Sequence, residues 1–232
     1  GTLPAFQANQ LIQILRDLVG VPAGGAPAGE SPVWFNLPLG LLLAAVAGWV
    51  IFGGLTRIAA VTSRMVPFMA VLYLGGVLFA LVLNAAEVPV AFALIVHDAF
   101  TGQAVAGGAL GTVIIYGVQR GAFSNEAGLG TEALVHGAAR TREPVREGLV
   151  AMFGPVIDTL LVCTATALMV LIAGDWRDPE ATGVTLTARA FTELLGPVGA
   201  VVIVVSVVCF STTTIFTQSF YGSQCAAFLF GT

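Results

Sequence analysis

The stretch Ser124-Asn125-Glu126-Ala127-Gly128-Leu129-Gly130-Thr131 decides how this chain folds, because it places polar residues where a membrane-spanning helix is expected. It follows the apolar run 105–116 and holds two glycines, an acid and an amide within eight residues. Each glycine weakens a helix by roughly 1 kcal/mol relative to alanine, and a carboxylate in hydrocarbon is costly unless it is partnered. Backbone leaves helical geometry inside a bilayer only where it lines a cavity or is buried in protein. We therefore predict a broken helix, which is typical of the binding sites of membrane transporters.

The composition is that of an integral membrane protein. Of the 232 residues, 57% are hydrophobic and 9% are charged, whereas a soluble domain carries about 25% charged residues. Cys163, Cys209 and Cys225 lie in or at the ends of apolar stretches, which favours packing over a metal site or a disulfide. The sequence contains no His/Cys ligand spacing, P-loop or nucleophile motif. It opens without Met and stops abruptly, so we interpret it as a middle piece of a longer protein.

Five segments are long and apolar enough to span a bilayer, which takes about 20 residues. They are 33–52, 65–83, 104–123, 149–173 and 198–220. An amphipathic partial helix, 3–19, precedes them, and a Gly- and Pro-rich linker, 20–31, follows it. Two further stretches, 89–100 and 186–195, are too short to span and are predicted to lie at the membrane interface.

Arginine placement predicts the orientation of these spans. Arg57 and Arg64 follow the first span, and Arg140, Arg142 and Arg146 follow the third. Because two spans separate the groups, both lie on one face, which the positive-inside rule makes cytoplasmic. We therefore predict a multi-pass protein of the cell (plasma) membrane with loops 53–66 and 140–147 in the cytoplasm.

Asp158 is an acid within the fourth predicted span, and it follows Pro155, which predicts a kink. One interpretation is packing, with Asp158 paired to an arginine. The other is a part in ion binding or in the gate around the ion, because intramembrane acids usually face a pathway. The nearby Thr159, Thr164 and Thr166 fit back-bonding to their own helix, which is the commoner use of threonine there.

Hydroxyl residues cluster in the last predicted span, at Ser206, Ser211, Thr212, Thr213, Thr214 and Thr217. Hydroxyl and carbonyl oxygens suit a hard cation, and neutral ligands favour sodium over calcium. Hydrogen bonds that hold helices together are the alternative. Four consecutive hydroxyls make that alternative less favoured for the group as a whole.

Two polar residues of the first helix, Gln7 and Asn9, are further candidates for a pocket. They are two residues apart, so a helix cannot point both at one spot. One can line a cavity while the other meets a neighbouring helix. Arg120, four residues before the broken stretch, is a candidate partner for Glu126 or Asp158, and an arginine at the membrane interface is the alternative.

Four blocks of sequence carry a family resemblance. They are RGAFSNEAGLGT (120–131), EPVREGLVAM (143–152), IDTLLVCTATAL (157–168) and QAN (7–9). Together they resemble the alanine or glycine:cation symporter family, the sodium:alanine symporters, in a specific match spread along nearly the whole chain. One departure is Thr131-Glu132-Ala133, where many members have small residues.

The resemblance implies an all-α fold, a polytopic transmembrane helix bundle with the LeuT-type inverted repeat. This chain is similar to about core helices three to eight, so residues 1–232 form a single transmembrane transporter domain that lacks its N- and C-terminal core helices. The broken stretch becomes the unwound part of core helix six. Ser211 and Thr212 resemble the sodium-coordinating turn of core helix eight. The absent first core helix carries half of the expected contacts, so this piece alone is not expected to transport.

We therefore predict a sodium-coupled symporter of small neutral amino acids, alanine or glycine, rather than an enzyme. The predicted substrate-binding residues are Gln7, Asn9, Ser124, Asn125, Glu126, Gly128 and Gly130, and the predicted Na+ site holds Val208, Ser211, Thr212 and Asp158. The partners are the amino-acid substrate and the lipid bilayer, with no nucleic acid. Proton coupling, an ion channel subunit and an intramembrane enzyme are the alternatives.

Overall fold

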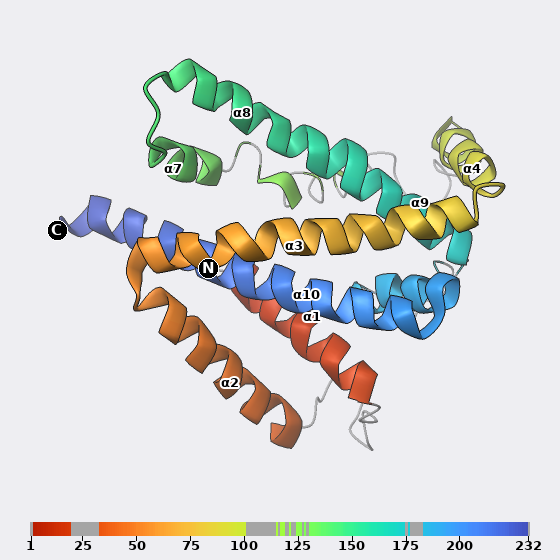
Figure 1. The fold of residues 1–232 in the computed structure, drawn as a ribbon, viewed down its shortest axis with the longest axis horizontal. Coiled ribbons are helices and arrows are strands. Elements are labelled where there is room, and N and C mark those ends of the chain that lie inside the picture. The colour runs from red at the N-terminus through yellow and green to blue at the C-terminus, as the bar shows by residue number, and fades with distance from the viewer. Residues whose placement is uncertain are drawn as a thin grey trace. The chain divides into compact units, whose positions relative to one another are not determined.

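All the elements of the computed structural model are helices (Figure 1). The structure describes residues 2–19, 33–100, 115, 117, 118, 121, 124–126, 128, 130–174, 176 and 183–231. In chain order the helices are α1 (Thr2–Val19), α2 (Val33–Ile51), α3 (Gly54–Leu83), α4 (Val88–Phe100), α7 (Thr131–Gly137), α8 (Pro144–Val156), the π-helix η1 (Ile157–Cys163), α9 (Thr164–Ala173) and α10 (Val184–Phe230). This confirms the all-α prediction for the described residues.

Four helical stretches are long and apolar enough to cross a membrane. They are Val33–Ile51, Thr56–Leu83, Pro144–Ala173 and Val184–Phe230. They contain four of the five predicted spans. The third predicted span, 104–123, lies outside the described residues except for Ile115, Gly117, Val118 and Gly121, which are helical.

The prediction that 53–66 is a loop is wrong, because α3 begins at Gly54 and runs through Arg57 and Arg64. The polar groups of this stretch are satisfied within the helix. The Thr62 hydroxyl donates to the Ile58 carbonyl at 2.8 Å. Arginine placement reports which side of a membrane a segment faces. It does not report whether the backbone there is helical.

Two compact units make up the chain, Gly1–Ala80 with Ala173–Thr232, and Leu81–Ile172. In the first unit, α1 packs against α10 and α2, and α2 packs against α10. One buried apolar cluster joins α2, α3 and α10, and consists of Ala47, Val50, Ile58, Phe216 and Phe220. A second contact lies farther along α3, where the Tyr73 ring centroid is 5.6 Å from that of Phe191 and 5.7 Å from that of Phe210.

Helix α10 is divided by Gly196, whose φ of 63° and ψ of −149° are not helical. Only glycine adopts this region readily, and Pro197 follows directly. Close by, a Cβ atom on Gly199 would lie 2.0 Å from the Phe191 carbonyl oxygen, so the backbone on the two sides of the bend is in tight contact. The bend separates residues 184–195 from the long part of α10, as the sequence predicted.

In the second unit, α8, η1 and α9 follow one another without interruption from Pro144 to Ala173. Pro155 lies inside α8, and Val156 and Ile157 keep helical dihedral angles. Proline lacks the N–H that donates the next helical hydrogen bond. Two residues later, at Ile157, the hydrogen bonding changes from the α to the π pattern. The short helix α7 is held to α8 by His136, whose Nδ1 lies 2.8 Å from Glu147 Oε1.

Candidate substrate and cation sites

The predicted break in the helix is confirmed by the backbone of Glu126, Gly128 and Gly130. Glu126, Gly128 and Gly130 have φ of 54°, 81° and 82°, all in the left-handed region. Glycine adopts this region at little cost. Glu126 is the only residue other than glycine with positive φ in the described part of the chain. A left-handed conformation costs a residue with a Cβ atom about 1–2 kcal/mol, so surrounding contacts must hold Glu126 in place.

Two hydrogen bonds fasten the start of the break to the π-helix. The Ser124 hydroxyl donates to Asp158 Oδ2 at 2.7 Å, and the Asn125 amide donates to the Thr159 hydroxyl at 3.0 Å. Adjacent residues on one segment thus meet adjacent residues on the other. Four polar side chains, two from the break and two from the π-helix, thus lie together.

The π-helix places Asp158 and Cys163 on one side of the helix, beside Ser124. A π-helix bonds residue i to residue i+5, so residues five apart stack along its surface. Cys163, five residues beyond Asp158, also lies beside Ser124, with Sγ 3.9 Å from Oγ. The Thr164 hydroxyl donates to the Thr159 carbonyl at 3.3 Å, again across five residues. Short π segments within helices are frequently found at functional sites.

The Glu126 carboxylate has a hydroxyl donor on the far side of the break. Thr131 Oγ1 donates to Glu126 Oε2 at 2.5 Å, and both side chains are half-buried. The bond spans the two left-handed glycines. Arg120, the candidate partner named from the sequence, lies outside the described residues.

In α1, Gln7 is half-buried and Asn9 is exposed, in line with two residues that cannot face one spot. The polar network of α1 lies at Gln10 and Gln13, which the sequence analysis did not single out. Gln10 Oε1 accepts from the Val184 N–H at 2.9 Å and so caps the start of α10. Next to it, Thr185 Oγ1 accepts from Gln13 Nε2 at 3.0 Å. The signal was present, because positions 10 and 13 share one face of a helix.

The hydroxyls of α10 divide into two groups. Thr212 Oγ1 donates to the Val208 carbonyl at 2.7 Å, and Thr213 and Thr217 bond their own helix in the same way. Ser206 and Ser211 are fully buried, and their hydroxyl oxygens have no hydrogen-bond partner among the residues that the structure describes. An unpaired buried hydroxyl is unfavourable, so both serines are candidate cation ligands, and Ser211 is the one that the sequence predicted. The predicted fourth member of the site, Asp158, belongs to the other compact unit.

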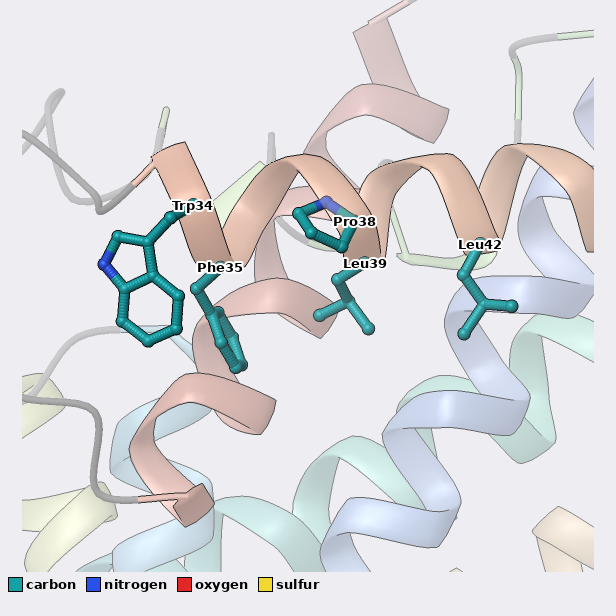
Figure 2. Close-up of a pocket in the computed structure, with 5 residues that line it drawn as sticks. All are labelled: Trp34, Phe35, Pro38, Leu39 and Leu42. Atoms are coloured by element: carbon teal, nitrogen blue, oxygen red, sulfur yellow. The ribbon is translucent and has the colours of Figure 1, made fainter.

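A hollow of about 350 Å³ lies on α2, and its lining residues are drawn in Figure 2. It is lined by Trp34, Phe35, Pro38, Leu39 and Leu42. Its lining offers no charged side chain to an amino-acid zwitterion. In the part of the chain that the structure describes, no three His, Cys, Asp or Glu side chains form a cluster that could hold a metal ion.

A polar break held against an apolar helix, in a chain with four helices able to cross a bilayer, defines a multi-pass membrane protein of the transporter class. A family model described as the sodium:alanine symporter family matches residues 1–232. The chain belongs to this family, which consists of transporters and not enzymes.

Three relatives illustrate the similarity. The chain is 41% identical to "Sodium/alanine symporter AgcS" of Methanococcus maripaludis, over 100% of this chain and 50% of that protein. It is 34% identical to "Sodium/proton-dependent alanine carrier protein" of Bacillus sp. strain PS3, over 98% of this chain and 51% of the relative. It is 38% identical to "Probable sodium/glutamine symporter GlnT" of Bacillus subtilis, over 84% of this chain and 41% of that protein. The chain thus spans about half the length of the curated relatives it matches.

Proposed function

We propose that this chain forms part of a sodium-coupled symporter for small neutral amino acids, with alanine or glycine as the substrate. The observation that carries the proposal is the fastening of the break to the π-helix through Ser124–Asp158 and Asn125–Thr159. These contacts gather hydroxyl, amide and carboxylate groups where the break meets an apolar helix. Family membership supports the same function, and two of the relatives are named for alanine.

The proposed substrate pocket lies at the break. Among the described residues, added Cβ atoms at Gly128 and Gly130 would meet nothing within 4 Å, which supports room for a small ligand there. Backbone groups at helix breaks bind the charged ends of amino acids in transporters of this kind. Gln7, Asn9, Ser124, Asn125 and Glu126 are proposed to complete the pocket.

The proposed Na+ site uses the Ser211 and Thr212 hydroxyls with the Val208 carbonyl. Ser211 supports it most directly, because its oxygen is buried with no partner in the described part of the chain. Oxygen ligands without a negative charge suit a monovalent hard cation. Asp158 is proposed to contribute the acid that tunes cation coupling. Sodium binding then stabilises the broken helices, substrate completes the site, and rocking of the bundle exposes both to the cytoplasm.

We further propose the LeuT-type inverted-repeat fold for the whole transporter, with residues 1–232 as one transmembrane domain covering about core helices three to eight. The break at 126–130 supports it, since discontinuous helices are typical of such folds. The segments around 53–66 and 140–147 are proposed to face the cytoplasm of a cell whose plasma membrane holds the protein.

Proton coupling is the second candidate, and a specific observation favours it. Glu126 and Asp158 are titratable, and each accepts a hydrogen bond from a hydroxyl at the break. One relative is named as dependent on both sodium and protons. The two cations therefore need to be tested separately.

The test is uptake of radiolabelled alanine and glycine by the full-length protein in liposomes, with sodium and proton gradients imposed one at a time. Saturable uptake driven by the sodium gradient supports the proposal. Uptake driven by the proton gradient alone would show that the coupling ion is the proton and not sodium. Flux that does not saturate, and that does not accumulate the amino acid against its gradient, would indicate a channel.

A further inference from the structure

The turn between α2 and α3 holds one arginine in a fixed position (Figure 1). The Arg57 guanidinium donates from Nη1 to the Trp49 carbonyl at 2.9 Å, and its central carbon lies 5.3 Å from the centroid of the Trp49 ring. The stem of the side chain passes over Gly53, where an added Cβ atom would overlap Cδ and Nε of the arginine. These contacts fix the direction of the Arg57 side chain, although the residue is exposed.

The fixed guanidinium keeps most of its donors for a ligand. Arginine has five N–H donors in a rigid, planar fork, and the bond to the Trp49 carbonyl uses one of them. Arg64 lies seven residues farther along α3, which places it two turns away on the same side of the helix. Neither arginine forms an ion pair with a residue that the structure describes. The turn therefore presents positive charge that the described part of the chain does not neutralise.

Aromatic side chains beside Arg57 mark the level of the membrane surface. Phe52, in the turn itself, is 94% exposed, and Trp49 is 68% exposed. Both α2 and α3 are long and apolar enough to cross a membrane. Tryptophan is enriched where a membrane meets water, and an arginine there keeps its charged end among the lipid headgroups. The phosphate layer of the bilayer would therefore lie at the depth of the Arg57 guanidinium.

We propose that the Arg57–Trp49 pair is a binding site for the phosphate of an anionic phospholipid. A guanidinium matches a phosphate through two parallel N–H···O bonds, and the ring contact holds it in place before the lipid arrives, so less freedom is lost on binding. The exposed faces of Trp49 and Phe52 offer apolar surface to the acyl chains. A zwitterionic lipid carries the same phosphate beside an ammonium group, which the arginine repels. The site lies outside the proposed substrate pocket and does not depend on which amino acid is transported.

The experiment uses the full-length protein in detergent with a phosphatidylglycerol that carries a photoactivatable group near its headgroup. The measurement is labelling of the fragment that contains residues 49–57, per folded molecule. Unlabelled phosphatidylglycerol is expected to compete at a concentration about fivefold lower than phosphatidylcholine with the same acyl chains, which is the effect of one arginine at a membrane surface. Inorganic phosphate is expected not to compete. Equal competition by the two lipids would overturn the proposal, and so would competition by inorganic phosphate as strong as that by phosphatidylglycerol.

Three variants separate a fixed guanidinium from charge alone. Arg57→Gln is expected to remove the fivefold preference. Gly53→Ala keeps the charge but displaces the arginine from Trp49, and is expected to lower the preference about twofold or more. Arg16→Gln is the matched control, because it removes the same charge from α1, where Arg16 lies 3.9 Å from Asp17.

That control is expected to leave the preference unchanged. An equal loss in Arg16→Gln and Arg57→Gln would assign the preference to net charge and overturn the proposed site. An unchanged preference in Gly53→Ala would overturn it as well, because the position of the guanidinium would then not matter. The readout is lipid binding and not uptake, so a failure here leaves the proposed transport function untouched.

Discussion

The Ser124 hydroxyl lies 2.7 Å from Asp158 Oδ2, and this bond joins two residues 34 positions apart. One residue begins the break, and the other lies in the first turn of the π-helix. An acid within an apolar helix is costly unless it has a partner. The bond therefore both satisfies Asp158 and holds the broken stretch against its neighbour.

Asp158→Asn is expected to weaken cation coupling more than it lowers the amount of folded protein. Asparagine keeps the shape and can still accept from Ser124, but it removes the charge. The sodium concentration for half-maximal uptake should rise about tenfold, as the loss of one charge-assisted interaction implies. The measurement is sodium-dependent uptake and detergent-stable yield on one preparation. Asp98→Asn, in an exposed pair with His97, is the control. Low yield with normal coupling would assign Asp158 a structural role.

Ser211→Ala is expected to raise the sodium concentration needed for half-maximal uptake more than Thr213→Val does. Ser211 has a buried hydroxyl that no described residue pairs with, whereas the Thr213 hydroxyl donates to the Cys209 carbonyl at 2.7 Å. If no cation binds, removing an unpaired buried hydroxyl should be neutral or stabilising. Adding Thr212→Val to Ser211→Ala should strengthen the effect. Unchanged sodium dependence in that double variant would exclude the proposed site.

Gly128→Asn and Gly128→Ala are expected to separate the size of the pocket from backbone strain. Gly128 has a φ of 81°, which asparagine tolerates better than alanine. Asparagine adds the larger side chain, so it should impair alanine binding more while straining the backbone less. The measurements are alanine affinity and thermal stability of the full-length protein. Normal affinity in the asparagine variant would place the pocket elsewhere.

Gln10→Leu is expected to lower the stability of the full-length protein by about 1 kcal/mol, a typical value for a hydrogen bond within a membrane protein. The change leaves the Val184 N–H at the start of α10 without its acceptor. Gln10→Glu keeps an acceptor oxygen and should lose less. Thermal unfolding in detergent checks both variants. Equal loss in the two would argue against capping as the cause.

Gly199→Ala is expected to destabilise the protein by about 1–3 kcal/mol or more through overpacking. Its Cβ would lie 2.0 Å from the Phe191 carbonyl oxygen, so the bend in α10 would have to open. Gly222→Ala, in the same helix, is the matched control, because nothing lies within 4 Å of the added atom. That control should raise stability slightly through helix propensity. Similar effects of the two changes would contradict this account of the bend.

Sequence reasoning succeeded where one local property dominates. Apolar length predicted the first span as 33–52, and α2 is observed as Val33–Ile51. The glycines and the acid predicted the break, and the left-handed residues lie there. It failed at 53–66, which was expected to be a loop between two spans, although the segment from Gly54 onward is helical. The predicted residues of the substrate pocket and the Na+ site stay predictions.

What the sequence by itself determined is the membrane character, the helical class and the position of the break, because hydrophobic length and the cost of glycine and charge are properties of short segments. Only the tertiary structure decided which partner each polar side chain has. The Ser124–Asp158 and Gln10–Val184 bonds join residues 34 and 174 positions apart. Such pairing depends on how helices pack and on the π register at 157–163. The unpaired Ser211 among bonded threonines is likewise a result of packing, since its neighbours in the sequence are also hydroxyls.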